Sequence, residues 1–136
     1  MPRFRKIKET CLYVTNIDRC RDFYEGKLGL KCFRHQDGRH VFFEVGDDVL
    51  LCFVSEDTKK LASLPAHYGE GYMHLAFECD KEAYAEWKQL VKDQGIKIEH
   101  TEDWGDGQES FYFRDPDNHL LEVVMPGLWK HLSSEA

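Results

Sequence analysis

The sequence contains one ten-residue pattern twice: residues 42–51 read FFEVGDDVLL, and residues 112–121 read YFRDPDNHLL. In both stretches an aromatic pair precedes a polar turn and two leucines, and residues 42 and 51 each lie 70 positions before their counterparts. Apolar runs on either side of a turn rich in Gly, Pro, Asp or Asn are typical of a β-hairpin. Two hairpins that share this whole pattern indicate an internal repeat.

The sequence around both hairpins repeats in the same order. Strands are predicted over residues 10–15, 30–35, 39–45 and 49–54 in the first half, and over residues 72–79, 96–100, 110–114 and 119–124 in the second. A helix follows the first strand of each half, starting at Asn16 or Asp18 and ending at Gly29, and starting at Asp80 and ending at Gly95.

The predicted fold class is therefore α+β, with two βαβββ modules in a single domain over residues 1–136. Module one covers about residues 7–55, a linker about 56–70 and module two about 71–126, before a short C-terminal tail. Because four strands leave one sheet face uncovered, we expect the modules to pair as a curled mixed sheet around a central cleft.

The composition restricts the classes of partner. Lys and Arg total 18 and Asp and Glu total 25 in 136 residues, so the formal net charge is −7. Nucleic acids and anionic membranes attract clustered positive charge, so neither is a predicted partner. With 42% hydrophobic residues but no apolar run near the roughly 20 that span a bilayer, the chain is predicted to be globular and cytoplasmic. Five scattered cysteines without a CxxC pair predict neither a disulfide framework nor a zinc cage.

The repeat makes two pairs of positions equivalent across the modules. Glu9 falls on His74, and at the offset of 70 Cys52 falls on Glu122. Glu122 lies between two leucines and two valines, where a carboxylate is costly unless it is paired, protonated or metal-bound. An outward-facing or salt-bridged Glu122 stays an equal alternative. Taken singly, His74 is more typical of a hydrogen-bonded core histidine, and Glu9 is more typical of a solvated side chain.

Four segments carry a resemblance to a known family: ETCLYVTNI at 9–17, FYEGKLGL at 23–30, GYMHLAF at 71–77 and SFYFRDPDNHLLE at 110–122. The sequence resembles the vicinal oxygen chelate superfamily, which includes glyoxalase I, extradiol dioxygenases and the fosfomycin and bleomycin resistance proteins. The likeness extends over residues 7–129.

This resemblance implies one divalent metal ion per site, with Glu9, His74 and Glu122 as its ligands. Oxygen-rich ligation suits Mn, Ni, Zn, Fe or Mg without selecting among them. The position of a fourth glyoxalase I ligand corresponds to Cys52, which breaks that pattern. Glutamate at position 9, where the family more often has histidine, disfavours an iron dioxygenase.

The resemblance also implies a function. We expect a metal-dependent enzyme of lyase or isomerase type that chelates a small substrate through adjacent oxygens and stabilises an enolate or alkoxide. Glu9 and Glu122 are the catalytic candidates for proton transfer. Two alternatives stay open: a metal-free drug- or metabolite-binding protein of the bleomycin-resistance type, and an extradiol-type dioxygenase. The family also implies a homodimer.

Seven residues are candidates for contacts with the substrate: Tyr13, Arg39, His40, Cys52, Trp104, Ser110 and Arg114. Trp104 is predicted to lie on a glycine-rich loop, where it covers the site or merely packs. Arg39 with His40 could form a surface turn, Arg114 could brace the turn at Asp115, and Cys52 could fill space. The remaining histidines are predicted to be structural or exposed: His35, His67, His100, His119 and His131.

Overall fold

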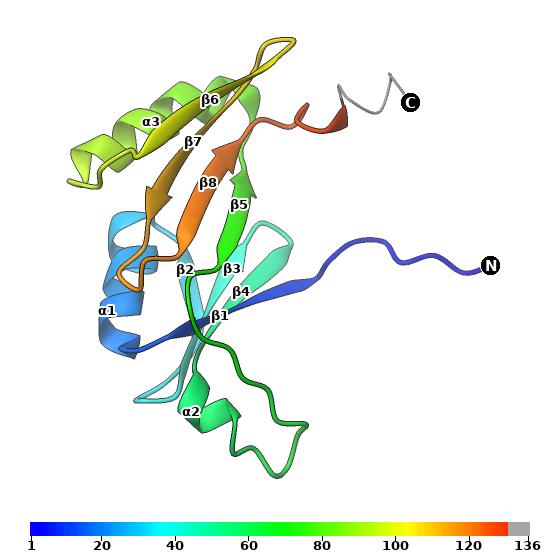
Figure 1. The fold of residues 1–136 in the computed structure, drawn as a ribbon, viewed down its shortest axis with the longest axis vertical. Coiled ribbons are helices and arrows are strands. Elements are labelled where there is room, and N and C mark those ends of the chain that lie inside the picture. Colours follow the sequence, from blue (N-terminus) through cyan, green and yellow to red (C-terminus); the bar gives the residue numbers. More distant parts are fainter. Residues whose placement is uncertain (131–136) are drawn as a thin grey trace. The chain divides into compact units, whose positions relative to one another are not determined.

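The computed structural model describes residues 1–130, which form two compact units: residues 1–71 make unit 1, and unit 2 begins at Tyr72 (Figure 1). Within the described residues each unit holds one four-stranded mixed sheet, ordered β1-β4-β3-β2 in unit 1 and β5-β8-β7-β6 in unit 2. The first and last strands of each unit are parallel neighbours, while the other pairs are antiparallel. This is βαβββ topology twice, and the predicted α+β class is confirmed. His131, to which the sequence assigns no specific role, lies outside the described residues.

Unit 1 contains the elements β1 (Glu9–Val14), α1 (Ile17–Arg21), η1 (Asp22–Lys27), β2 (Lys31–Gln36), β3 (His40–Val45), β4 (Asp48–Val54) and α2 (Ser55–Thr58). Asn16 caps α1, because its side chain accepts a hydrogen bond from the Arg19 N–H at 2.9 Å. The helix predicted to reach Gly29 is instead a short α-helix continued by the π-helical η1. Gly29 ends this segment at a φ of 75°, which glycine adopts readily.

The core of unit 1 lies on one face of its sheet. Successive strand residues point to opposite faces, and the alternate residues Leu12, Val41, Phe43, Leu50 and Cys52 are all 2% exposed or less. Helix α1 packs on β3 and β4 (Figure 1). The other strand face remains available to form a site.

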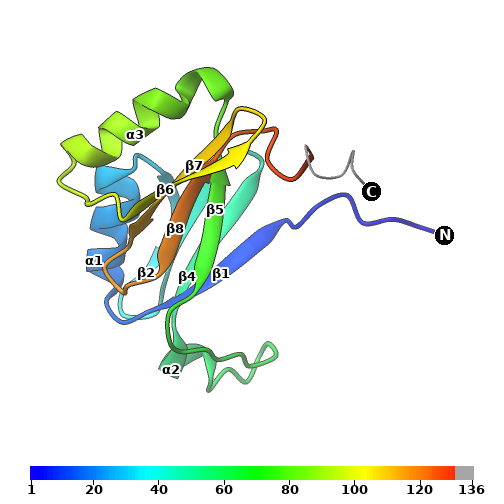
Figure 2. The same ribbon diagram turned by 45° about the horizontal axis from the view of Figure 1, so that its top comes forward.

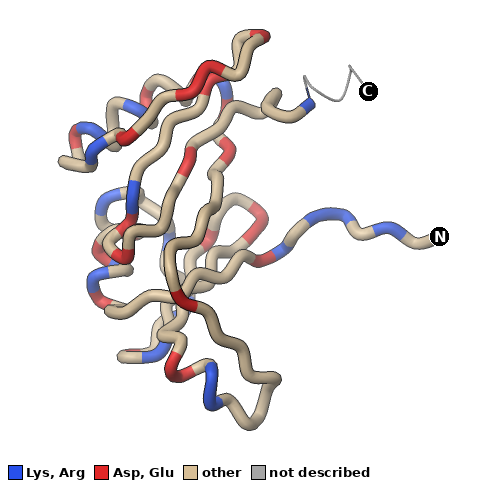
Figure 3. Tube along the Cα trace, in the orientation of Figure 1, with Lys and Arg blue, Asp and Glu red and all other residues tan. Residues whose placement is uncertain are grey.

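Residues 1–8 extend beyond β1 as an arm (Figure 1). The arm contains four basic residues, Arg3, Arg5, Lys6 and Lys8, which appear as blue stretches between tan ones in Figure 3. The Lys6 ammonium lies 2.7 Å from the Asp48 carboxylate, which ties the base of the arm to the turn between β3 and β4. Phe4 and Ile7 of the arm are largely exposed.

Unit 2 contains β5 (His74–Glu78), η2 (Lys81–Ala83), α3 (Tyr84–Asp93), β6 (His100–Gly105), β7 (Gln108–Arg114) and β8 (Leu120–Val124). Figure 2 shows α3 running along its sheet. Tyr84 and Val91 of α3 are buried, and the Tyr84 ring contacts Phe111 edge-on at 5.5 Å. None of the helices within residues 1–130 is long and apolar enough to cross a membrane.

Strand β6 differs from the prediction. It begins at His100, where the predicted strand 96–100 ends, and it includes Trp104, which was predicted to lie on a loop. Gly105 pairs with Gln108, so only Asp106 and Gly107 form the turn, with φ values of 53° and 76°. Asp-Gly with two positive φ angles is the pair that a tight two-residue hairpin turn requires. Trp104 is therefore held by a strand.

The register of the two hairpins corrects the repeat by one residue. Phe42 lies opposite Leu51 in unit 1, and Tyr112 lies opposite Glu122 in unit 2. Position 112 follows 42 by 70 residues, whereas 122 follows 51 by 71, because five residues separate the paired Arg114 and Leu120 but only four separate the equivalent Glu44 and Val49. Leu51, and not Cys52, is thus the structural counterpart of Glu122.

Candidate functional sites

A histidine and a buried glutamate lie side by side in unit 2. His74 begins β5 and Glu122 is in the middle of β8, on the face of the sheet that also presents Tyr112. The His74 Nε2 atom is 3.2 Å from the Glu122 Oε1 atom. Only 6% of the Glu122 side chain is exposed, against 49% of the His74 side chain. The carboxylate is therefore buried beside a histidine that is half exposed.

The hydrogen bonds around His74 determine which ring nitrogen carries a proton. Its Nδ1 atom lies 2.8 Å from the Leu120 carbonyl oxygen, which can only accept, so Nδ1–H is the donor. In the neutral ring Nε2 then presents a lone pair to a carboxylate oxygen. The other oxygen, Glu122 Oε2, is buried and finds no hydrogen-bond partner among the described residues. His74 Nε2 and Glu122 Oε1 are thus two acceptors that face each other, and Glu122 Oε2 is buried without a hydrogen bond. A cation between or beside these atoms, either a proton or a metal ion, would stabilise the arrangement.

Tyr112 and Ser110 complete this part of the sheet. Burial raises the pKa of the Tyr112 phenol; the interaction with Ser110 lowers this pKa, and the interaction with Glu122 raises it. The Tyr112 ring centroid is 6.2 Å from that of His74. Ser110 is fully buried and accepts a hydrogen bond from Trp104 Nε1 at 2.9 Å. Trp104 also contacts Trp129 edge-on at 5.2 Å, so both predicted contact residues are fixed by packing within unit 2.

Arg114 is engaged at the base of the β7–β8 connection. Its guanidinium binds the Glu99 carboxylate at 2.8 Å and 3.3 Å and the Asn118 carbonyl oxygen at 3.1 Å. These contacts match the bracing alternative that the sequence left open.

Unit 1 has a cavity of about 720 Å³ on the sheet face opposite its core. Its walls include the predicted residues Glu9, Tyr13, Arg39 and His40. Glu9 lies opposite Val49 at the start of β1, as His74 lies opposite Leu120 at the start of β5. The two positions predicted to be equivalent therefore share one register position in their own sheets.

Cys52 does not line this cavity. Its side chain is fully buried on the core face, paired in register with Leu12 and Val41, which are also buried. Leu51, its neighbour on β4, lines the cavity instead. The sequence placed Cys52 at the site because the repeat was aligned at an offset of 70, and a shift of one residue turns a strand side chain to the opposite face.

His67 is a cavity residue that the sequence did not identify. It belongs to the segment after α2, and its Nδ1 atom lies 2.7 Å from the Tyr13 hydroxyl. No periodic pattern in residues 59–71 predicts this position, because the contact joins residues that are far apart in the chain.

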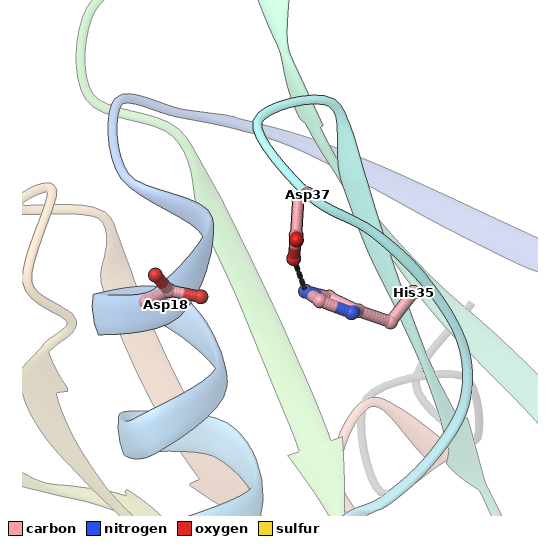
Figure 4. Close-up of side chains that lie close together, drawn as sticks. All are labelled: Asp18, His35 and Asp37. Atoms are coloured by element: carbon pink, nitrogen blue, oxygen red, sulfur yellow. Dashed lines mark ion pairs between the residues drawn. The ribbon is translucent and has the colours of Figure 1, made fainter.

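A second possible cation site lies on the surface of unit 1. Ligand atoms of Asp18, His35 and Asp37 lie within 4.8 Å of one another, and His35 Nε2 is 3.3 Å from Asp37 Oδ1 (Figure 4). The two aspartates are exposed, with 94% of the Asp37 side chain open to solvent, whereas 25% of the His35 side chain is exposed. Solvated aspartates gain little from such proximity, so this cluster serves below as a control.

Comparison with known proteins identifies the family of this chain. The sequence model of the Glyoxalase/Bleomycin resistance protein/Dioxygenase superfamily matches residues 6–123. The chain belongs to this superfamily.

Individual relatives are enzymes by name. The crystal structure of a lactoylglutathione lyase from Agrobacterium tumefaciens is similar with a TM-score of 0.88 and 32% identity, covering 93% of this chain and 98% of that one. Glyoxalase I of Saccharomyces cerevisiae is 28% identical over 144 residues, and the match covers 90% of this chain but 44% of the yeast protein. The metallothiol transferase FosB of Staphylococcus saprophyticus is 27% identical over 121 residues, covering 88% of this chain and 76% of FosB.

Proposed function

We propose that this chain is a divalent-metal-dependent enzyme of lyase or isomerase type, acting on a small substrate that it binds through two adjacent oxygens. The arrangement of His74 and Glu122 carries the proposal. A histidine whose Nδ1–H is held by a backbone carbonyl has its Nε2 lone pair oriented for a metal ion. The buried Glu122 carboxylate beside it supplies the negative charge that a divalent cation requires.

Glu9 is the proposed third ligand. Its register position matches that of His74, and its side chain lines the cavity of unit 1. One imidazole and two carboxylates suit Mn, Ni, Zn, Fe or Mg. Members of this superfamily typically bind such an ion, which supports the assignment.

A bound divalent ion would polarise a substrate carbonyl and stabilise the negative charge of an enolate or alkoxide. The protein then has to move one proton. Glu122 Oε2 is the atom for this role, because it is buried and free of hydrogen bonds within the described part of the chain. It takes the proton from the hydroxyl-bearing carbon beside the carbonyl and returns it to the former carbonyl carbon, while the hydroxyl proton passes to the other of the two adjacent oxygens, so the net change is an isomerisation. The Nδ1–H bond to Leu120 keeps the imidazole in place meanwhile.

The test is metal analysis of protein purified without chelators. We expect one ion per chain in the parent and a large loss of metal in His74→Ala, Glu122→Gln and Glu9→Gln. The control is His35→Ala, which removes the imidazole of the surface cluster and is expected to keep the ion.

The opposite result overturns the proposal. If the parent contains no metal and takes up no added Mn²⁺, Ni²⁺ or Zn²⁺, the metal-free binding protein becomes the better description. If His35→Ala alone loses the ion, the metal belongs to the surface cluster.

A further inference from the structure

The cavity of unit 1 contains a cluster of aromatic rings that the proposed metal chemistry does not use. Phe42 and Phe53 meet edge-to-face with ring centroids 5.3 Å apart, and His40 stacks on Phe42 at 4.4 Å with an 18° angle between the planes. His67 meets Phe53 edge-on at 4.9 Å and holds the Tyr13 hydroxyl. All five rings line the same cavity.

The strand register gives the position of this cluster relative to Glu9. Tyr13, Phe53 and His40 form one row across β1, β4 and β3. Glu9 is four residues before Tyr13, which corresponds to about 13 Å along the strand at roughly 3.3 Å per residue. Phe42 belongs to the row between them. The cavity therefore runs from a carboxylate at one end to aromatic rings at the other.

One polar atom of the wall at the aromatic end lacks a partner among the described residues. His40 Nε2 is buried and has no hydrogen-bond partner in the part of the chain that the structure describes. Burial lowers the pKa of His40, and the neighbouring Arg34 and Arg39 lower it further, which favours the neutral ring. A neutral imidazole nitrogen can donate to or accept from one oxygen of a ligand.

The charges around the cavity balance. Arg39 is paired with Asp57 through two contacts of 2.9 Å, and the remaining charged wall residues are Glu9 and Arg34. The aromatic end therefore offers no net charge that would attract a charged group of a ligand. Buried aromatic walls favour flat aromatic groups, which stack offset or edge-to-face.

We propose that this end of the cavity binds an aromatic group of the substrate, with its ring in contact with Phe42 and Phe53 and an oxygen of that group hydrogen-bonded to His40 Nε2. The inference rests on the proposed function, since it assigns the adjacent oxygens of the same molecule to the Glu9 end. A cavity of about 720 Å³ has room for two fused rings together with those oxygens.

The test uses the full chain stripped of metal with EDTA, so the metal site does not affect it. Calorimetry compares 2-naphthol with its saturated analogue decahydro-2-naphthol and with naphthalene, which lacks the hydroxyl. Amide chemical-shift changes locate the bound probe. We expect 2-naphthol to bind about fivefold tighter than the saturated analogue and several-fold tighter than naphthalene, with shifts centred on β3 and β4.

Two variants separate the ring from the nitrogen. Phe42→Leu should remove most of the preference for 2-naphthol over the saturated analogue. His40→Phe should keep that preference and remove the preference for 2-naphthol over naphthalene. The control Phe4→Leu, on the exposed arm, should change neither.

Equal binding of the aromatic and saturated probes to the parent, or shifts centred outside this cavity, overturns the inference. If the parent contains metal but shows no preference for 2-naphthol over the saturated analogue, this inference is refuted and the proposed function is not. If the parent binds no metal but prefers 2-naphthol over the saturated analogue, the proposed function is refuted and this inference is not.

Discussion

Substituting Glu122 by glutamine should have opposite effects on stability with and without metal. In the metal-free parent, the His74 Nε2 lone pair faces a carboxylate oxygen at 3.2 Å, and the second oxygen is buried without a hydrogen bond in the described chain. A glutamine amide of the same shape can donate an N–H to Nε2. The new N–H bond satisfies the buried Nε2 acceptor and removes the unpaired carboxylate charge, which is worth about 1–3 kcal/mol, so Glu122→Gln should raise the metal-free free energy of unfolding by that amount.

With metal, the order should reverse. The parent gains about 4 kcal/mol when the free ion exceeds its Kd by about 1,000-fold, whereas the variant lacks a ligand and gains little. The assay is thermal and urea unfolding at pH 8, where free imidazoles are uncharged, in EDTA and in excess Mn²⁺. For a chain of this length, 1 kcal/mol corresponds to a Tm shift of about 3–5 °C.

The surface pair of His100 and Glu102 is the matched control. Its Nε2–Oε2 distance is 2.7 Å, but 58% and 41% of the two side chains are exposed. Glu102→Gln should change stability by less than about 0.5 kcal/mol with or without metal. If Glu122→Gln destabilises the protein in EDTA, a proton joins His74 to Glu122 as an ordinary ion pair, and the argument for a metal ion fails.

Four further outcomes are expected. Cys52→Ser, which buries a hydroxyl in the core of unit 1, should cost about 1–3 kcal/mol in urea unfolding and leave the metal content unchanged; loss of metal would contradict its assignment to the core face. Trp104→Phe removes the N–H that Ser110 accepts and should lower the free energy of unfolding by about 1 kcal/mol, while an unchanged value would mean that this bond adds nothing. Burial lowers the pKa of His40 below its ordinary value of 6.5, so as the pH falls the unfolded chain takes up a proton at this residue before the folded chain does. The contribution of the neutral ring to the free energy of unfolding should be fully present above pH 6.5 and should decline below it. His40→Phe should show a smaller decline than the parent. We also expect a homodimer, so a sedimenting species of 16.0 kDa at micromolar concentration would contradict that expectation.

The sequence predicted the repeated fold because both hairpins display their turns and apolar residues directly. It misplaced Cys52 because the pairs Leu50-Leu51 and Leu120-Leu121 align without a gap. The structure absorbs the extra residue in the β7–β8 connection, where Asn118 has a φ of 68° and Asp115 Oδ1 accepts the N–H groups of Asp117 and His119 at 2.9 Å each. One extra residue in this connection does not alter the pattern of apolar residues, but it shifts the register by one and so moves each side chain to the opposite face of the sheet.

The site was less predictable than the fold. Glu9, His74 and Glu122 were named through a family resemblance, and their residue types alone left ordinary structural roles open. His67 and the stacking of His40 on Phe42 depend on how the chain returns to the sheet after α2, which no local pattern encodes. The glycines after Trp104 predict a loop, whereas Gly105 and Gly107 allow a tight turn that extends the strand.

The longer β7–β8 connection has a consequence for how this molecule can change over evolutionary time. It leaves the first half of the repeat with leucine where the second half has an acid, so the duplicated halves are chemically unlike at matching positions. Mutations that reshape the ring-lined hollow fall between residues 9 and 67, and those that alter the histidine–glutamate pair fall between 74 and 122. Under the two proposals, the aromatic contacts and two of the three metal ligands therefore lie in separate halves of the sequence, and mutations can change them separately.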